Sequence, residues 1–245
     1  QIEIGLIGKY VELHDSYKSI TESMIHAGDR NEVKVNVRWI HSEALSVDNA
    51  GENLRGLDAV LVAPGFGSRG FEGKIEAVRI AREEGIPFLG ICFGMQAAVI
   101  EYSRNVLQLK GANSSEVEPD CAQPVIGLMS EQKQVTNMGG TMRLGACDCV
   151  LSEGSRAKEI YGKDSISERH RHRYEFNNAY LEDLASAGMQ ASGINPQTGL
   201  VEIIEVPDHP WFLAVQFHPE YQSTVVNPHP LFVAFIKAAK TYNNK

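Results

Sequence analysis

Short apolar runs alternate with longer amphipathic segments through the first hundred residues. The apolar runs predict buried strands at 2–7, 33–40, 59–62 and 87–91. The segments between them predict helices at 17–27, after an Asp15-Ser16 cap and before Gly28, at 75–84 before Gly85, and at 95–105. Because strands that alternate with helices form parallel sheets, this half of the chain predicts a sheet covered by helices on both faces.

The pattern becomes less regular beyond residue 110. Residues 111–141 are rich in Asn, Ser and Gly, which predicts loops over the sheet edge. Shorter apolar runs, a turn at 195–199 that favours an antiparallel hairpin, and a final helix at 230–242 follow. The runs predicted as strands are 146–151, 173–176, 189–194, 201–206 and 212–217. We therefore predict one α/β domain over 1–245, with a mostly parallel central sheet flanked by helices and a small antiparallel appendage.

Composition excludes several classes of protein. The 245 residues include 23 basic and 31 acidic side chains, a formal net charge of −8. Because duplex nucleic acid is bound through basic surfaces, we expect no nucleic-acid partner. No apolar run approaches the roughly 20 residues that span a bilayer, and no signal peptide opens the chain, so we expect no membrane association and a cytoplasmic location. The chain begins at Gln1, which suggests a processed chain or a piece of a longer one.

Four cysteines are too few for a disulfide scaffold at this length, so we expect reduced thiols. Cys147 and Cys149 share one face of a predicted strand, which suggests a metal site. No second close pair completes a set of four ligands, however, and zinc pairs are usually spaced more widely. The sequence therefore predicts no metal site, and Cys92 alone has unusual neighbours.

Cys92 lies in Gly90-Ile91-Cys92-Phe93-Gly94, between a predicted strand and a predicted helix. This is the spacing of a nucleophile elbow, with Cys in place of Ser. Glycines on both sides permit the tight turn, and the positive end of the helix dipole favours the thiolate. Taken alone, the pentapeptide equally fits a buried cysteine that serves only packing.

His218-Pro219-Glu220 supplies the base and the orienting carboxylate that a thiol nucleophile needs. In extended backbone, residues two apart project to the same side, so the ring and the carboxylate can meet. Pro219 disfavours a helical conformation for His218. A lone His-Pro-Glu is a weak signal, but together with the elbow it predicts a triad.

A glycine-rich loop, Pro64-Gly65-Phe66-Gly67-Ser68-Arg69-Gly70, follows the third predicted strand. Ligands of doubly wound sheets bind beyond the carboxyl ends of the strands, so we expect this loop beside Cys92. The backbone N–H groups of Gly65 and Phe93 are then candidates to stabilise a developing oxyanion. A glycine turn without a ligand, or a weak phosphate loop, is the alternative.

The elbow, extended by Met95-Gln96, and His218-Pro219-Glu220 together resemble the class I glutamine amidotransferases. Further stretches look like one branch of that family, the glutaminase domain of the CTP synthases. The similarity covers almost the whole chain and is most specific at 138–145 and 168–175. The other similar stretches are 8–10, 15–19, 113–116 and 208–212.

The resemblance implies a role for each matching residue. Cys92 is the nucleophile, His218 the base and Glu220 its orienter, while Gly65 and Phe93 supply the oxyanion N–H groups. The remaining residues of the glutamine site are Gly94, Met95, Gln96, Glu116 and Arg173. A carboxylate such as Glu116 suits the α-ammonium group of glutamine, and an Arg suits its α-carboxylate. Without the resemblance, residues 169–173 indicate a solvated basic face or a minor anion site.

The resemblance also implies the reaction, in which glutamine is hydrolysed to glutamate and ammonia through a γ-glutamyl thioester, without a cofactor. In the full enzyme, which is expected to be a homo-oligomer, an amidoligase domain uses the ammonia, ATP and Mg²⁺ to convert UTP to CTP, and GTP activates glutamine hydrolysis. We expect that N-terminal domain to lie outside this chain, which contains no Gly-x-x-x-x-Gly-Lys-Ser/Thr loop and should make no CTP alone.

Two positions depart from the family pattern. Phe93 stands where Leu is common, which leaves the backbone N–H in place. Pro64 replaces a glycine and removes one potential donor, so Gly65 is the remaining donor of this loop. Other classes stay open: a stand-alone γ-glutamyl hydrolase, a glutaminase partner of another synthase, or a regulatory module without activity.

Overall fold

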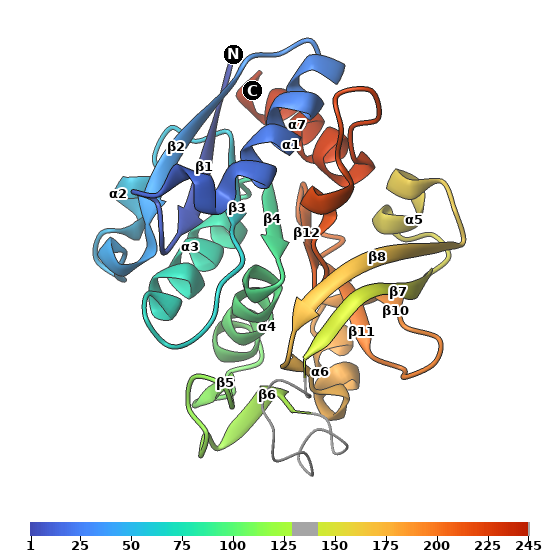
Figure 1. Ribbon diagram of the computed structural model, residues 1–245. Coiled ribbons are helices and arrows are strands. Elements are labelled where there is room, and N and C mark those ends of the chain that lie inside the picture. The colour runs from blue at the N-terminus through green and yellow to red at the C-terminus, as the bar shows by residue number, and fades with distance from the viewer. Residues whose placement is uncertain (129–141, 245) are drawn as a thin grey trace.

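In the computed structural model, which describes residues 1–128 and 142–244, nine strands form one mixed sheet (Figure 1). Its parallel half consists, in spatial order, of β2 (Val35–His41), β1 (Ile2–Gly8), β3 (Ala59–Val62), β4 (Phe88–Ile91) and β12 (Phe212–Val215). Its antiparallel half continues with β11 (Val201–Glu205), β10 (Gln190–Ile194), β7 (Arg143–Leu151) and β8 (Ser165–His172). The predicted α/β class is confirmed, and the antiparallel part extends the central sheet itself.

Helices cover both faces of this sheet, as predicted. One layer contains α1 (Lys18–Arg30), α5 (Arg156–Tyr161) and α7 (Pro230–Asn243). The other contains α2 (Ala50–Leu54), α3 (Phe71–Glu83), α4 (Phe93–Asn105) and α6 (Leu181–Ser186). Side chains of the buried strands alternate between the two layers, so that Leu61 packs in the first core while Val60 and Val62 pack in the second.

A second, small sheet corrects the prediction that residues 111–141 form loops. It consists of β5 (Ala112–Ser114), β6 (Gln123–Gly127) and β9 (Glu175–Phe176), and lies near the end of α4 in Figure 1. Only short pieces such as Val125 and Ile126 are buried there, too few for a periodic signal. The remainder of the predicted loop, 129–141, lies outside the described residues.

Strand β8 is absent from the predicted elements, although its burial alternates strictly along its length. Its inward side chains include Glu168, His170 and His172, whereas Arg169 and Arg171 point outward and are exposed. A strand is predicted from alternating apolar residues, and here three of the four buried positions are polar. The interpretation of residues 169–173 as a solvated basic face therefore holds for the exposed arginines alone.

The first helix also differs from its prediction. Asp15 and Ser16 lie in a short 3₁₀ turn, His14–Tyr17, and α1 follows without a side-chain cap. Gly28 lies inside α1, not beyond its end. A Cβ at Gly28 would lie 2.8 Å from Val35 Cγ2 and 2.9 Å from the Val33 carbonyl oxygen. This glycine therefore permits close packing of α1 on the chain that enters β2.

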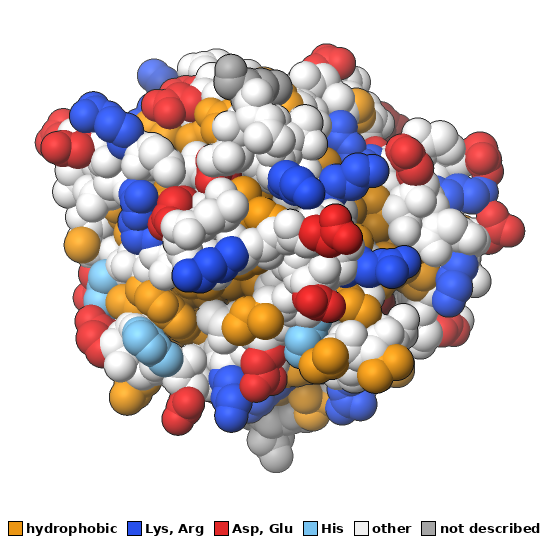
Figure 2. Space-filling model, turned by 90° about the horizontal axis from the view of Figure 1, so that it is seen from above, with side chains coloured by type: hydrophobic (Ala, Val, Ile, Leu, Met, Phe, Trp, Pro, Cys, Tyr) orange, Lys and Arg blue, Asp and Glu red, His pale blue; other side chains and the backbone are white. Residues whose placement is uncertain are grey.

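The surface seen from above the view of Figure 1 carries charges of both signs. Among its described side chains, Lys and Arg lie between Asp and Glu, and no large area has a single sign (Figure 2). Within residues 1–128 and 142–244, no helix combines the length and apolar composition that a membrane crossing requires.

We predict that Gly28→Ala destabilises the protein although alanine is the better helix former. The added methyl group overpacks the contact with Val33 and Val35, which should lower the free energy of unfolding by about 1–3 kcal/mol. Gly51→Ala in α2 is the matched control, because a Cβ there meets Ile80 Cδ1 at an ordinary 3.8 Å. Urea unfolding measures both variants, and equal effects of the two substitutions would contradict the packing role of Gly28.

Candidate functional site

Cys92 occupies the turn between β4 and α4, at the carboxyl end of the parallel strands. Its backbone has φ 53° and ψ −103°, a conformation that is uncommon outside glycine. Its N–H donates a 2.7 Å hydrogen bond to the carbonyl oxygen of Val215, at the end of the neighbouring strand β12. The residue is 2% exposed and stands at the N-cap of α4, where the helix dipole favours a negative sulfur.

Two glycines make this turn possible. A Cβ at Gly90 would lie 2.8 Å from the backbone carbon of Gly94, and a Cβ at Gly94 would lie 2.2 Å from the carbonyl oxygen of Val62. Any larger residue would therefore push α4 away from the ends of β3 and β4. The strand–turn–helix geometry expected of an elbow is present in the structure.

His218 and Glu220 form a buried pair beyond the end of β12. The carboxylate Oε1 of Glu220 lies 2.7 Å from His218 Nδ1, and both residues are about 5% exposed or less. The prediction that extended backbone brings the two side chains together is wrong. His218 precedes a 3₁₀ turn, Pro219–Gln222, and this turn brings the carboxylate back to the ring.

The protonation of His218 depends on both of its acidic neighbours. Burial by itself lowers the pKa of the ring, but interactions with Cys92 and with Glu220 outweigh it and raise the pKa of His218 to about 11. A raised imidazole pKa beside a thiol favours a thiolate–imidazolium pair. The arrangement can therefore hold a charged nucleophile and a proton donor together out of water.

Two glutamines connect Cys92 to the neighbouring elements. Gln216, which is not among the predicted site residues, places its Nε2 3.7 Å from Cys92 Sγ. Gln96 on α4 donates to the backbone carbonyl of Tyr174 at 3.1 Å, and its own buried Oε1 has no partner within the described residues. Gln216 could have been found from its place in the predicted strand 212–217, two residues before His218.

The loop after β3 approaches the beginning of α4. A Cβ at Gly65 would lie 3.4 Å from Phe93 Cδ1, so loop and helix are in contact there. The Phe93 ring is buried and stacks on Phe71 at 4.3 Å between centroids. The two predicted oxyanion residues are thus brought together at the rim that carries Cys92.

Glu116 contacts this loop. Its Oε1 accepts a 2.9 Å hydrogen bond from the backbone N–H of Gly67. Burial raises the pKa of Glu116, and the Gly67 hydrogen bond and the charges of Arg173 and Lys9 partly oppose that rise. Because Arg173 is close enough to act on Glu116, the two predicted glutamine-binding charges lie in one region. Gly94 and Met95 are buried in the first turn of α4.

A buried polar network lies behind the site. Arg143 contacts Glu202 at 2.6 Å and Glu175 at 3.2 Å, and the His170 and His172 rings are joined at 2.8 Å between Nδ1 and Nε2. Burial lowers the pKa of His170 to about 3 and that of His172 well below its ordinary value. Both rings are therefore neutral near pH 7, and Arg143 carries the positive charge of this network.

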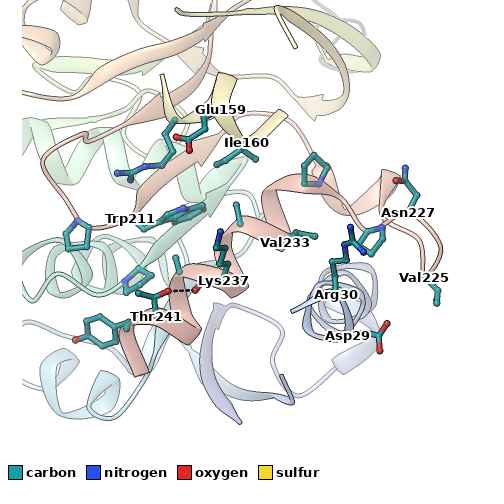
Figure 3. A pocket seen from close by; sticks show the side chains of 18 of the residues that line it. Asp29, Arg30, Glu159, Ile160, Trp211, Val225, Asn227, Val233, Lys237 and Thr241 are labelled. Atoms are coloured by element: carbon teal, nitrogen blue, oxygen red, sulfur yellow. Dashed lines mark hydrogen bonds between the residues drawn. The ribbon is translucent and has the colours of Figure 1, made fainter. Parts of the chain in front are cut away.

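A surface groove of about 900 Å³ lies elsewhere, between α1, α5 and α7 (Figure 3). Its lining includes Trp211 and Pro87, which precede β12 and β4, so it lies at the amino ends of the strands. No predicted site residue lines it. Among the described residues, no group of three or more His, Cys, Asp and Glu is arranged to hold a metal ion.

The sequence matches a known family and known proteins over nearly its full length. The model of the family Glutamine amidotransferase class-I matches residues 12–238. Over 245 residues the chain is 65% identical to a CTP synthase of Christiangramia forsetii, covering 45% of it, and 65% identical to one of Flavobacterium psychrophilum, covering 46%. The chain thus spans about half the length of the curated relatives it matches.

Solved structures give the same result. The glutaminase domain of Trypanosoma brucei CTPS, with bound acivicin, matches with a TM-score of 0.93 and 39% identity, over 98% of this chain and 94% of that one. A glutamine amidotransferase of Thermotoga maritima matches with a TM-score of 0.55 at 9% identity, over 100% of this chain and 99% of that one. The second match supports the fold alone.

We predict that Glu220→Gln lowers the pKa of His218, because the imidazolium loses its carboxylate acceptor. Hydrogen bonds to charged groups contribute about 1.5–3 kcal/mol, so we expect a downward shift of about one to two pH units. NMR titration of the His218 ring measures the shift. Glu220→Asp keeps the charge and is the control.

The same substitution has a defined effect on stability. A pKa raised from 6.5 to about 11 stabilises the folded chain fully below pH 6.5, and this contribution is lost as the pH rises through about 11. The stability that Glu220→Gln removes should therefore be largest below pH 6.5 and shrink toward alkaline pH. A loss of stability that grows with pH would show that the pair is not held in this way.

Proposed function

Because the chain belongs to the class I glutamine amidotransferases, and within them to the glutaminase domains of CTP synthases, we propose that it hydrolyses L-glutamine through Cys92, His218 and Glu220. The observation that carries the proposal is the buried arrangement at the end of β12. A cysteine on a strained turn interacts electrostatically with a histidine whose Nδ1 is held by a carboxylate and whose buried Nε2 has no hydrogen-bond partner within the described residues. This combination fits nucleophilic catalysis better than packing alone.

The proposed reaction begins with attack of the Cys92 sulfur on the side-chain amide carbon of glutamine. The π electrons of the carbonyl move to its oxygen, which the N–H groups of Gly65 and Phe93 stabilise. The imidazolium of His218 donates its proton to the amide nitrogen, ammonia leaves, and a γ-glutamyl thioester remains. Water then gives a proton to the neutral His218 and attacks the thioester, which releases glutamate and restores the thiolate.

Glu116 and Arg173 are proposed to bind the two charged ends of the substrate. The carboxylate of Glu116 suits the α-ammonium group, and the Arg173 guanidinium suits the α-carboxylate. Their mutual electrostatic interaction supports a common location at the site. Gly94, Met95 and Gln96 complete the proposed pocket, and Gln96 Oε1, which has no partner in the part of the chain that the structure describes, is an acceptor available to the substrate.

In the whole protein, we propose that the ammonia passes to an amidoligase domain, where ATP and Mg²⁺ are used to convert UTP to CTP and where GTP acts as activator. The relatives named CTP synthase, of which the chain covers 45% and 46%, support this partnership. Residues 1–245 then form the glutamine amidotransferase domain of a protein expected to assemble as a homo-oligomer. The glutaminase step itself is proposed to need no cofactor.

Cys92→Ala tests the proposed nucleophile. Since no other group takes over the covalent step, glutamine hydrolysis should fall by about 10³-fold or more while the protein remains folded. Glutamate release and thermal unfolding measure the two effects. A glutamine-mimicking diazoketone should label Cys92 in the unmodified chain, and substantial hydrolysis by the variant would refute the assignment. Preference for γ-glutamyl peptides over free glutamine would favour the γ-glutamyl hydrolase class instead.

Glu116→Ala and Arg173→Ala test the proposed glutamine clamp. Each removes a charge-assisted contact of about 1.5–3 kcal/mol, so the KM for glutamine should rise roughly ten- to 150-fold. Turnover should fall as well, because the amide is positioned less well. Arg171→Ala removes an exposed arginine of β8 and is the matched control. Variants at Glu116 and Arg173 that both keep the original KM and turnover would exclude the clamp.

A further inference from the structure

A fully buried lysine lies under the loop that follows β3. Lys74, in the first turns of α3, is 1% exposed. Its Nζ donates hydrogen bonds to two main-chain carbonyl oxygens, of Ala63 at 2.6 Å and of Pro64 at 3.2 Å. Burying an ammonium group against neutral acceptors is costly, because its charge loses the stabilisation that water provides. An apolar side chain would fill the same space on α3 without this cost, so packing does not account for a lysine here.

The contact with Pro64 determines the orientation of one peptide group. No cis peptide bond occurs in the described chain, so the Pro64–Gly65 peptide is trans and its carbonyl and N–H point in opposite directions. Because the carbonyl is directed to Lys74 Nζ, the Gly65 N–H is directed away from the lysine. The peptide is also confined, since a Cβ at Gly65 would lie 3.2 Å from Nζ on one side and 3.4 Å from Phe93 Cδ1 on the other.

The charge of Lys74 also acts on the nucleophile. Burial lowers its pKa to about 7, while attraction to Cys92 raises the pKa and repulsion by Lys9 lowers it. Nζ lies over the Phe93 ring, 5.1 Å from its centroid, so it is next to the side chain that follows Cys92. A cation in this place favours negative charge on the sulfur and on an oxygen that develops beside it.

We propose that Lys74 is a positioning residue that holds the Pro64–Gly65 peptide with its N–H turned toward the oxyanion and adds positive charge behind that donor. This inference rests on the proposed glutamine hydrolysis. It extends the oxyanion site from the two backbone donors to the side chain that orients one of them. Lys74 itself need not touch the substrate.

Lys74→Met tests the proposal, because methionine has a similar length but neither donor nor charge. Loss of one oxyanion donor lowers turnover by about 10²–10³-fold in enzymes. We therefore expect kcat to fall by roughly 10²-fold while the KM for glutamine changes by less than about threefold. A KM effect alone, or an unchanged kcat, would overturn the proposal.

A second measurement separates this role from a merely structural one. L-Glutamate γ-semialdehyde presents an aldehyde carbon to the Cys92 sulfur. A C–S bond forms, the π electrons move to oxygen, and the resulting oxyanion occupies the same site. Its affinity should fall in Lys74→Met by about the same factor as kcat. Unchanged affinity beside a large loss of kcat would show that Lys74 does not act on the oxyanion.

Two further variants keep the test decisive. Ile80→Ala, on the same helix beside Gly51, removes buried volume away from the loop and controls for lost stability. If Ile80→Ala destabilised the protein as much as Lys74→Met and lowered kcat as much, the proposal would be overturned. Lys74→Gln keeps N–H donors without the charge and should recover part of the affinity for the aldehyde. Failure of the function itself is recognised separately, as absent hydrolysis by the unmodified chain or full hydrolysis by Cys92→Ala.

Discussion

The strained backbone of Cys92 is the constraint on which the rest of the site depends. A non-glycine residue in such a conformation costs of the order of 1–3 kcal/mol and persists only where its surroundings leave no alternative. Here the Val215 carbonyl accepts the Cys92 N–H, and the glycines at 90 and 94 let β4 and α4 pack too closely for the turn to relax. The position of the sulfur is therefore set by the central sheet and not by a loop.

The charged groups around this turn have different kinds of partner. Arg143 contacts Glu202 and Glu175 in a buried cluster in which burial raises the pKa of Glu175 to about 8, and the neighbouring histidines are uncharged. His218 is paired with Glu220, whereas Lys74 contacts carbonyl oxygens. His218 and Lys74 each interact electrostatically with the thiol, where a negative intermediate would form. Because the surroundings exclude water, each of these charges acts more strongly than it would at the surface.

The sequence predicts the parallel strands, the elbow and the two residues of the His–Glu pair because each depends on local spacing. Contacts between distant segments could not be predicted from the sequence. Lys74 resembles any charged residue of an amphipathic helix until the fold places it under residues 63 and 64. Strand β8 was missed because it buries histidines, and Gly28 was misread because its contact partner, the chain entering β2, is revealed only by packing. Even the correct pairing of His218 with Glu220 rested on an extended geometry that the structure replaces with a 3₁₀ turn.

The place of β12 in the sheet has a consequence for how the protein is made. This strand lies between β4 and β11, in the middle of the sheet, yet it comes late in the chain. It brings Val215 and Gln216 to Cys92, and the latter contact spans 124 residues. Pairing across so long a loop is a slow, non-local step. While a ribosome is still extending the chain, Cys92 therefore exists without His218, and the thiol meets the histidine proposed as its base only when the last central strand enters the sheet.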